Sequence, residues 1–156
     1  MKAVLLSVRH QHIVDMHTGK KTSELRTKFP KIPTPFKVYN LDAVSSGGCG
    51  KVVSEWVCRD ITEWLMYMGI PAHLSKVACV SNEHIWNYCD KGNKNIGEMR
   101  ICNLIIYDKS KELSEFIKPC STPFQCDKCN DLVEGFGCGR TILRPPQSWC
   151  YVEEMG

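Results

Sequence analysis

The sequence lacks several features that assign a chain to a class of protein. No apolar run approaches the ~20 residues of a membrane-spanning helix, so we expect no membrane partner. The first residues turn polar at Arg9, before the apolar core of a signal peptide can form, and this favours a cytoplasmic protein. The net charge of +3 and the pI of 8.3 are too mild to indicate a nucleic-acid-binding domain by themselves.

Common catalytic and nucleotide-binding signatures are also missing. The stretch from Gly47 to Lys51 lacks the spacing of a Walker loop. We interpret it as a hairpin tip, the alternative being that its backbone and Lys51 approach a phosphate. The five histidines form no H-E-x-x-H motif, and each is interpreted as an ordinary surface or core residue. With no repeat or linker, 156 residues at 43% hydrophobic content predict one domain over residues 1–156.

Cysteine, in contrast, is abundant, with ten residues. In a reducing cytoplasm these are buried thiols or metal ligands. An irregular, Cys-rich insertion at about 119–140 contains Cys120, Cys126, Cys129 and Cys138. Four thiolates around a structural Zn²⁺ would let this segment fold, but the second C-x-x-C of common zinc sites is missing, and free thiols are the alternative. We predict no other cofactor. Five further cysteines are predicted to be small core hydrophobes: Cys58, Cys79, Cys89, Cys102 and Cys150.

Hydrophobic periodicity predicts a compact mixed fold. The predicted strands are short and rich in apolar residues, and they cover 2–8, 23–27, 36–41, 51–58, 99–107 and 148–153. The predicted helices cover 9–18, 60–68, 81–92 and 111–118. Strands this short and turn-linked fit a small barrel better than a parallel βαβ sheet, so the predicted fold class is α+β.

Residues 19–26 concentrate polar chemistry at one strand end. On a strand, Glu24 and Arg26 share a face, and Lys21 lies where the strand begins. An arginine can hold a phosphate or carboxylate through two hydrogen bonds. By composition alone, the stretch is typical of a solvated strand edge, and the wall of a ligand site is the alternative.

The residues of this stretch and their order along the chain resemble the ASCH domain family, in the PUA-like superfamily, and its phage-associated and bacterial members in particular. The family motif G-x-K-x-x-E-x-R is met by Gly19, Lys21, Glu24 and Arg26. Three flanking segments also resemble family elements: the opening strand at 2–8, the glycine-then-strand element at 50–55 and the ending at 144–151. The resemblance implies a small β-barrel of five to six mostly antiparallel strands, three to four short surrounding helices, and a cleft that holds the motif.

The resemblance further implies a domain that binds RNA or a modified nucleoside, in RNA-linked regulation. In this hypothesis Lys21, Glu24 and Arg26 contact the ligand. Additional ligand contacts are expected from Arg9, Lys20, Lys51 and Trp149. Tyr39 and Trp56 are further candidates for stacking on a base, if they line the cleft.

The alternative is a hydrolase. Some enzymes similar to this family cleave the acyl amide of a modified cytidine, and others are metal-dependent ribonucleases. For this chemistry the candidate catalytic residues are Lys21, Glu24, Glu55 and Ser148. Glu24 stands where the amidohydrolase branch has its threonine nucleophile, so a water would have to attack instead. The sequence leaves open a binding module, a hydrolase and a purely structural domain, and it does not give the oligomeric state.

Overall fold

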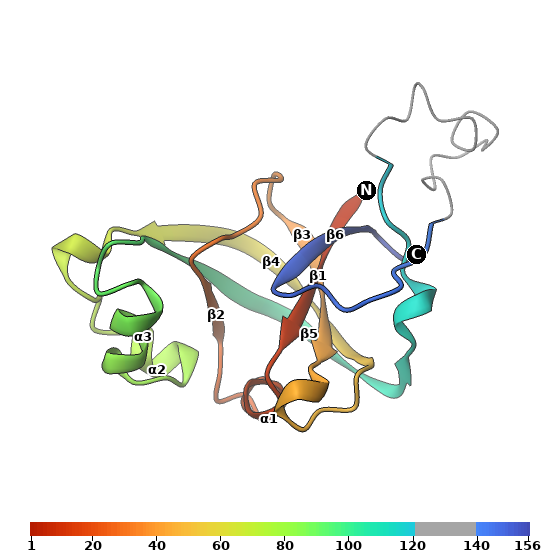
Figure 1. Ribbon diagram of the computed structural model, residues 1–156, viewed down its shortest axis with the longest axis horizontal. Helices are drawn as coiled ribbons and strands as arrows, with labels where there is room; N and C mark the ends of the chain where they lie inside the picture. Colours follow the sequence, from red (N-terminus) through yellow and green to blue (C-terminus); the bar gives the residue numbers. More distant parts are fainter. Residues whose placement is uncertain (121–139) are drawn as a thin grey trace. The chain divides into compact units, whose positions relative to one another are not determined.

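The computed structural model describes residues 1–120 and 140–156, and Figure 1 labels its elements. The strands are Lys2–Val8 (β1), Ser23–Arg26 (β2), Phe36–Asp42 (β3), Val52–Trp64 (β4), Ile96–Lys111 (β5) and Trp149–Glu153 (β6). The α-helices are His10–His17 (α1), Leu74–Ala78 (α2) and Asn82–Tyr88 (α3). Single 3-10 turns cover Val44–Ser46 (η1), Met66–Met68 (η2) and Leu113–Glu115 (η3). Among the described residues, no helix is long and apolar enough to span a bilayer.

The six strands form one sheet in the order β2-β5-β4-β3-β1-β6. β1 runs antiparallel to β6, and β2 runs antiparallel to β5, which confirms the predicted α+β class. In this order β2 and β6 are edges, so the described sheet is open and does not close into the predicted barrel. β1 and β3 are parallel, a pairing that we did not expect. The long connection containing α1 and β2 supplies the crossover that a parallel pair requires.

The chain divides into two compact units, and the long strands β4 and β5 contribute residues to both. Unit 1 comprises Met1–His10, Lys37–Glu55 and Ile105–Gly156, of which 121–139 lie outside the described residues. Unit 2 comprises Gln11–Phe36 and Trp56–Leu104. The single domain expected over residues 1–156 stays a prediction.

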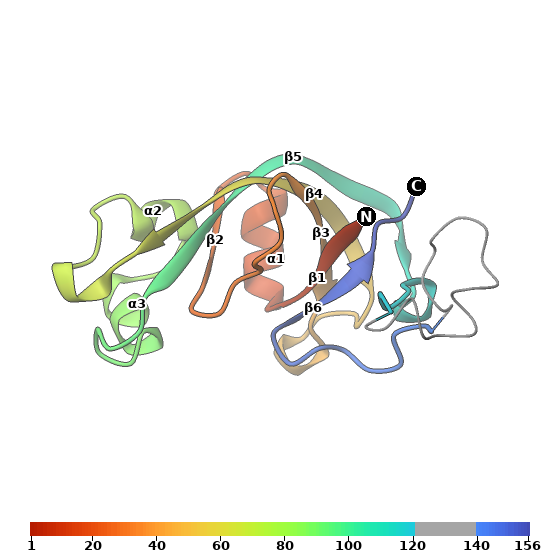
Figure 2. The same ribbon diagram turned by 90° about the horizontal axis from the view of Figure 1, so that it is seen from above.

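Unit 1 has an apolar core built on β1 and β3. The rings of Tyr39 and Phe116 meet edge to face, with centroids 4.9 Å apart. Figures 1 and 2 show β6 lying alongside β1, which agrees with their register. The buried members of this core are Ala3, Leu5, Tyr39, Leu41, Val52, Phe116, Ile142 and Val152.

Unit 2 has a second apolar core beneath α2 and α3, which Figure 2 shows side by side. The Ser81 hydroxyl caps α3 by accepting a hydrogen bond from the His84 backbone N–H at 3.0 Å. This core contains Leu25, Met66, Leu74, Ala78, Ile85, Cys89 and Ile96. Because Leu25 belongs to β2, the core holds the helices against the strand that carries the motif.

Two predicted helices are wrong, and one helix was missed. Residues 60–64 continue β4, because their β-branched side chains suit a strand and β5 provides a neighbouring backbone. Residues 111–118 contain only a 3-10 turn, since β5 extends to Lys111. α2 was not predicted, because Gly69 and Pro71 indicated an irregular segment. The strands predicted at 2–8, 36–41 and 148–153 and the helix at 9–18 are confirmed within one residue at each end.

Candidate functional site

The motif begins where α1 ends. Gly19 has a φ of 79°, a left-handed conformation that a residue without Cβ adopts at little cost, and its N–H donates to the Met16 carbonyl at 3.1 Å. The Lys21 N–H then donates to the Asp15 carbonyl at 2.9 Å. These bonds fold the chain back along α1, as expected for a glycine that follows a helix.

Lys21 is buried rather than at an open cleft mouth, with only 3% of the residue exposed. Its Nζ donates to the carbonyl oxygen of Ala78, the last residue of α2, at 2.9 Å. The same Nζ lies 3.9 Å from Glu24 Oε1. Lys21 therefore ties β2 to the end of α2 and places a positive charge beside Glu24.

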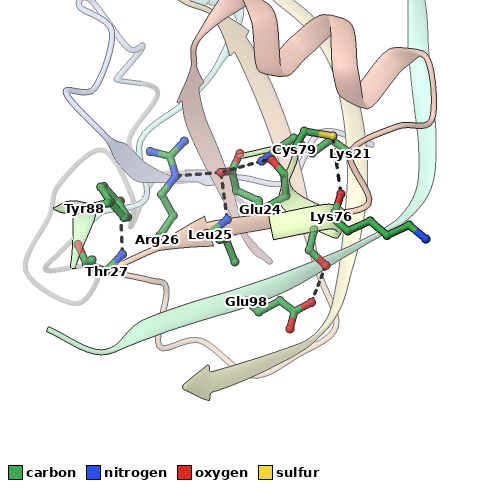
Figure 3. A network of polar contacts seen from close by, with 11 residues as sticks. Lys21, Glu24, Leu25, Arg26, Thr27, Lys76, Cys79, Tyr88 and Glu98 are labelled. Carbon is green, nitrogen blue, oxygen red and sulfur yellow. Dashed lines mark hydrogen bonds and ion pairs between the residues drawn. The ribbon is translucent and has the colours of Figure 1, made fainter. Parts of the chain in front are cut away.

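Glu24 is also buried, and it lies between Lys21 and Arg26 (Figure 3). Its Oε1 accepts a hydrogen bond from the Leu25 backbone N–H at 3.1 Å and lies 3.7 Å from Arg26 Nε. The sequence hypothesis that Lys21, Glu24 and Arg26 act as one group is consistent with this geometry. Their predicted contact with a ligand stays a prediction.

The protonation states of Glu24 and His12 follow from this burial. Burial raises the pKa of Glu24, but the charges of Lys21 and Arg26 outweigh it, and the pKa lies below its usual 4.5. Burial and the charge of Lys21 lower the pKa of His12 below its usual 6.5, against the opposing effect of Glu24. At neutral pH the site thus holds a carboxylate and an uncharged imidazole.

Two polar atoms of this group lack hydrogen-bond partners. Within the described residues, the buried side-chain atoms without a hydrogen-bond partner are Glu24 Oε2 and His12 Nδ1. An unsatisfied buried acceptor costs free energy, and native proteins rarely leave one without a reason. A carboxylate oxygen accepts and cannot donate, so Glu24 Oε2 is suited to a ligand that brings an N–H or O–H group.

These shifts predict acid sensitivity. Both folded-state pKa values are lowered, so the unfolded chain binds more protons, and stability falls as pH falls. The contribution of His12 is complete above pH 6.5 and that of Glu24 above pH 4.5, and each is lost as pH falls through its folded-state pKa. We expect His12→Gln to reduce the decrease in the free energy of unfolding that begins just below pH 6.5. Urea unfolding at a series of pH values measures this decrease. His84→Gln is the control, and an equal reduction by both variants would contradict the assignment.

The other face of β2 carries a second polar group, which centres on Glu98 of β5. Glu98 Oε2 accepts from Ser23 Oγ at 2.7 Å, and Oε1 accepts from Trp64 Nε1 at 3.0 Å. His73 Nε2 lies 2.8 Å from the same Oε1. Burial raises the pKa of Glu98, but the hydrogen bonds from His73, Ser23 and Trp64 outweigh it and lower the pKa below 4.5.

Sequence reasoning missed the Glu98 group entirely, as well as His12. Ser23, Trp64, His73 and Glu98 are separated along the chain and form no motif. The pairing of β2 with β5 brings Ser23 near Glu98, and no local pattern reports that register. His12 could have been found, because it lies on the helix that immediately precedes the motif.

The remaining predicted site residues have other surroundings. Lys20 is an exposed residue of unit 2, next to Lys21. The others belong to unit 1: Arg9, Lys51, Glu55, Ser148 and Trp149. Lys51 Nζ forms an ion pair with Glu112 at 2.9 Å. The roles proposed for these residues in binding or catalysis stay predictions.

Glu55 is already engaged within unit 1. Its Oε1 accepts from Tyr107 Oη at 2.9 Å, and its Oε2 lies 3.0 Å from Lys37 Nζ. Burial and this hydrogen bond raise the pKa of Tyr107. These two contacts use two of the roughly four acceptor positions of a carboxylate, so Glu55 is partly engaged but keeps acceptor positions of its own.

The aromatic candidates differ in accessibility. Tyr39 and Trp56 are completely buried, so the condition that they line a cleft is not met, and neither can stack on a base in this structure. Tyr39 instead accepts a hydrogen bond from the Met155 N–H at 2.8 Å. Trp149 is half-buried and packs against Tyr151, with ring centroids 5.0 Å apart.

The predicted zinc site falls mostly outside the described residues. Cys126, Cys129 and Cys138 lie there, and only Cys120 is described, so the site stays a prediction. No group of three or more potential metal ligands occurs within residues 1–120 and 140–156. Cys58 and Cys89 are buried thiols, as predicted, whereas the other three core candidates are half-buried. Burial raises the pKa of Cys58 to about 12, which makes this thiol unreactive.

Three crystal structures from Zymomonas mobilis share this arrangement of elements. A tyrosine-to-phenylalanine mutant of ZmASCH superposes with a TM-score of 0.68 over 99% of this chain and 92% of that one, at 13% identity. The fold is that of the ASCH domains. The ASCH protein itself gives a TM-score of 0.67 at 12% identity, covering 97% of this chain and 88% of that chain. A serine-to-alanine mutant gives 0.66 at 12% identity, covering 97% and 89%.

The ASCH fold is what this likeness establishes, because identities of 12–13% are too low to transfer function. Scans against protein-family models and against curated proteins found no match. The family expectation drawn from the motif is therefore confirmed at the level of fold. What an ASCH fold does in this chain depends on the side chains of its own sites.

Proposed function

We propose that this chain binds RNA or a modified nucleoside through the group formed by Lys21, Glu24 and Arg26. The observation that carries this proposal is the buried, unsatisfied Oε2 of an ionised Glu24. An exocyclic amino group of a base, or a ribose hydroxyl, donates the hydrogen bond that this oxygen lacks. Lys21 and Arg26 keep the acceptor charged, so the bond formed is a charge-assisted one.

Binding is favoured over hydrolysis by the same electrostatics. A general base works best when its pKa lies near the working pH, and the lowered pKa of Glu24 makes it a weak base at neutral pH. Lys21 donates to Ala78 and is buried, so it is held in place as a fixed charge. The proposal also retains the reducing cytoplasm as the working compartment, which suits the free thiols of Cys58 and Cys89.

Glu24→Gln tests this proposal. The substitution keeps the size of the side chain but removes the charge and one acceptor oxygen. A wild-type ligand is first identified at low salt from a panel of modified nucleosides and short RNAs, by calorimetry. We expect Glu24→Gln to weaken its binding at least about tenfold, since a hydrogen bond to a charged group contributes roughly 1.5–3 kcal/mol.

The matched control is Glu63→Gln, at an exposed glutamate of the same unit, which should leave affinity unchanged. Thermal unfolding of both variants separates a binding effect from loss of the fold. No binding by the wild-type chain at low salt, or equal affinity in Glu24→Gln, would disprove the proposal. Turnover of the bound nucleoside, followed by mass spectrometry, would instead establish a hydrolase.

A further inference from the structure

A cavity of about 440 Å³ lies in unit 2, beside the Glu98 group. Its volume falls within the range of small-molecule sites, roughly 300–1,000 Å³. Polar side chains of Thr62, Glu98 and Arg100 share its wall with the apolar surfaces of Trp64, Val77 and Ile101. A pocket with apolar walls and a few placed polar groups is the usual form of a ligand site.

The carboxylate of Glu98 in the cavity wall already accepts hydrogen bonds from neighbouring side chains. Glu98 receives hydrogen bonds at 2.7–3.0 Å from Ser23, Trp64 and His73, which occupy three of the roughly four acceptor positions of a carboxylate. The Glu98 side chain is only 11% exposed, so this arrangement is held inside the wall. It fixes the orientation of the Trp64 indole, whose ring meets the His73 ring edge to face with centroids 5.4 Å apart.

One polar group of the cavity wall is an unused donor. Arg100 lies opposite Ser23 in the β2–β5 register, so the two side chains emerge on the same face of the sheet. Arg100 is exposed, and within the described residues its guanidinium has no hydrogen-bond or ion-pair partner. A guanidinium has five N–H donors in a planar fork that matches a carboxylate or a phosphate.

We propose that this cavity is a second binding site, for a small organic anion. The carboxylate or phosphate of the ligand binds Arg100, and its apolar ring packs against Trp64 and the aliphatic wall of Val77 and Ile101. Glu98 acts as a positioning residue, because it holds Trp64 and His73 and leaves Arg100 to the ligand. The guanidinium of Arg100 beside the oriented indole of Trp64 thus favours a ligand that carries an anionic group on a flat apolar ring.

This second site is independent of the motif. Successive side chains of a strand point to opposite faces, so Ser23, on the cavity wall, and Glu24 lie on different faces of β2. Failure of the anion site would therefore leave the proposed nucleoside site standing, and the reverse also holds. Glu24→Gln is expected to leave anion binding unchanged.

Titration with three related probes tests the site in the full chain. Phenylacetate and phenyl phosphate carry the two possible anionic heads, and phenylacetamide is the neutral match. The readout is the indole N–H signal of Trp64 in a nitrogen–proton correlation spectrum, identified by its absence in Trp64→Phe. We expect at least one anion to shift this signal and to bind at least about tenfold tighter than phenylacetamide, as a charged hydrogen bond implies.

Arg100→Gln should abolish this preference for the anion and leave the weak binding of phenylacetamide in place. The matched control is Arg59→Gln, at an exposed arginine of unit 2 that does not line the cavity, and it should keep the preference. Preference for one anion over the other identifies the head group. The proposal fails if all three probes bind equally, if none shifts the Trp64 signal at millimolar concentration, or if Arg100→Gln keeps the preference.

Discussion

Lys21→Met is expected to lower the free energy of unfolding by about 3–5 kcal/mol, because it removes one of the two cations beside the buried carboxylate of Glu24 and leaves Arg26 as the other. The Nζ is almost completely buried, and it holds both the Ala78 carbonyl and the Glu24 carboxylate in unit 2. Methionine fills a similar volume, so the loss reports the charge and the hydrogen bond rather than a cavity. Urea unfolding at neutral pH measures it.

A double-mutant cycle isolates the Lys21–Glu24 interaction. The pair Lys21→Met and Glu24→Gln should cost less than the sum of the two single variants, because the double variant removes the buried negative charge together with the lysine beside it. Lys20→Met, at the exposed neighbouring lysine, should change stability by no more than about 0.5 kcal/mol. A Lys21→Met variant as stable as Lys20→Met would show that the buried charges do not depend on each other.

Trp56→Ala should lower the free energy of unfolding by about 3–5 kcal/mol, the range for removing a large buried aromatic side chain. Trp56 is among the largest fully buried side chains of the described chain, so its removal leaves a cavity that β4 cannot close. Chemical denaturation checks the size of this effect. Tyr67→Ala is the comparison, since Tyr67 is 75% exposed and its loss should cost no more than about 0.5 kcal/mol.

Trp56→Phe separates a core role from a stacking role. Phenylalanine keeps most of the apolar volume, so this variant should fold and retain the affinity of the wild-type chain for any nucleoside ligand. A Trp56→Phe variant that folds normally but no longer binds the ligand would show that Trp56 stacks on the ligand. That result would contradict the interpretation that Trp56 serves only to fill the core.

The elements that local pattern determines were predictable. The apolar run of β1, the helix that stops at Gly19 and the alternation of β3 each follow from a few neighbouring residues, and the structure confirms them. The order of these elements around the motif was also enough to predict the ASCH fold. The helix predicted at residues 60–68 is wrong because a tertiary contact outweighs the local pattern. Pairing with β5 overrides a D-x-x-E pattern that suggested a helix start.

Burial of the motif was not predictable from charge. A stretch with two lysines, a glutamate and an arginine is typical of a solvated edge, and β2 is indeed an edge strand. The partner that allows Lys21 to be buried is a carbonyl at the end of α2, a helix that the sequence did not predict. Contacts between residues as distant as Lys21 and Ala78 depend on tertiary packing, and a single sequence does not encode them in any short motif.

The pairing of β1 with β6 sets the order in which unit 1 can fold. Lys2 lies opposite Glu153, so β1 acquires its second neighbour only after the chain has been made as far as β6. Until then β1 has one open side, a row of unpaired backbone groups that can recruit another chain. Contacts this distant in sequence also close slowly, because a long loop must be ordered first. Folding of this unit should therefore be slow, and a shortened chain that ends before Trp149 should aggregate.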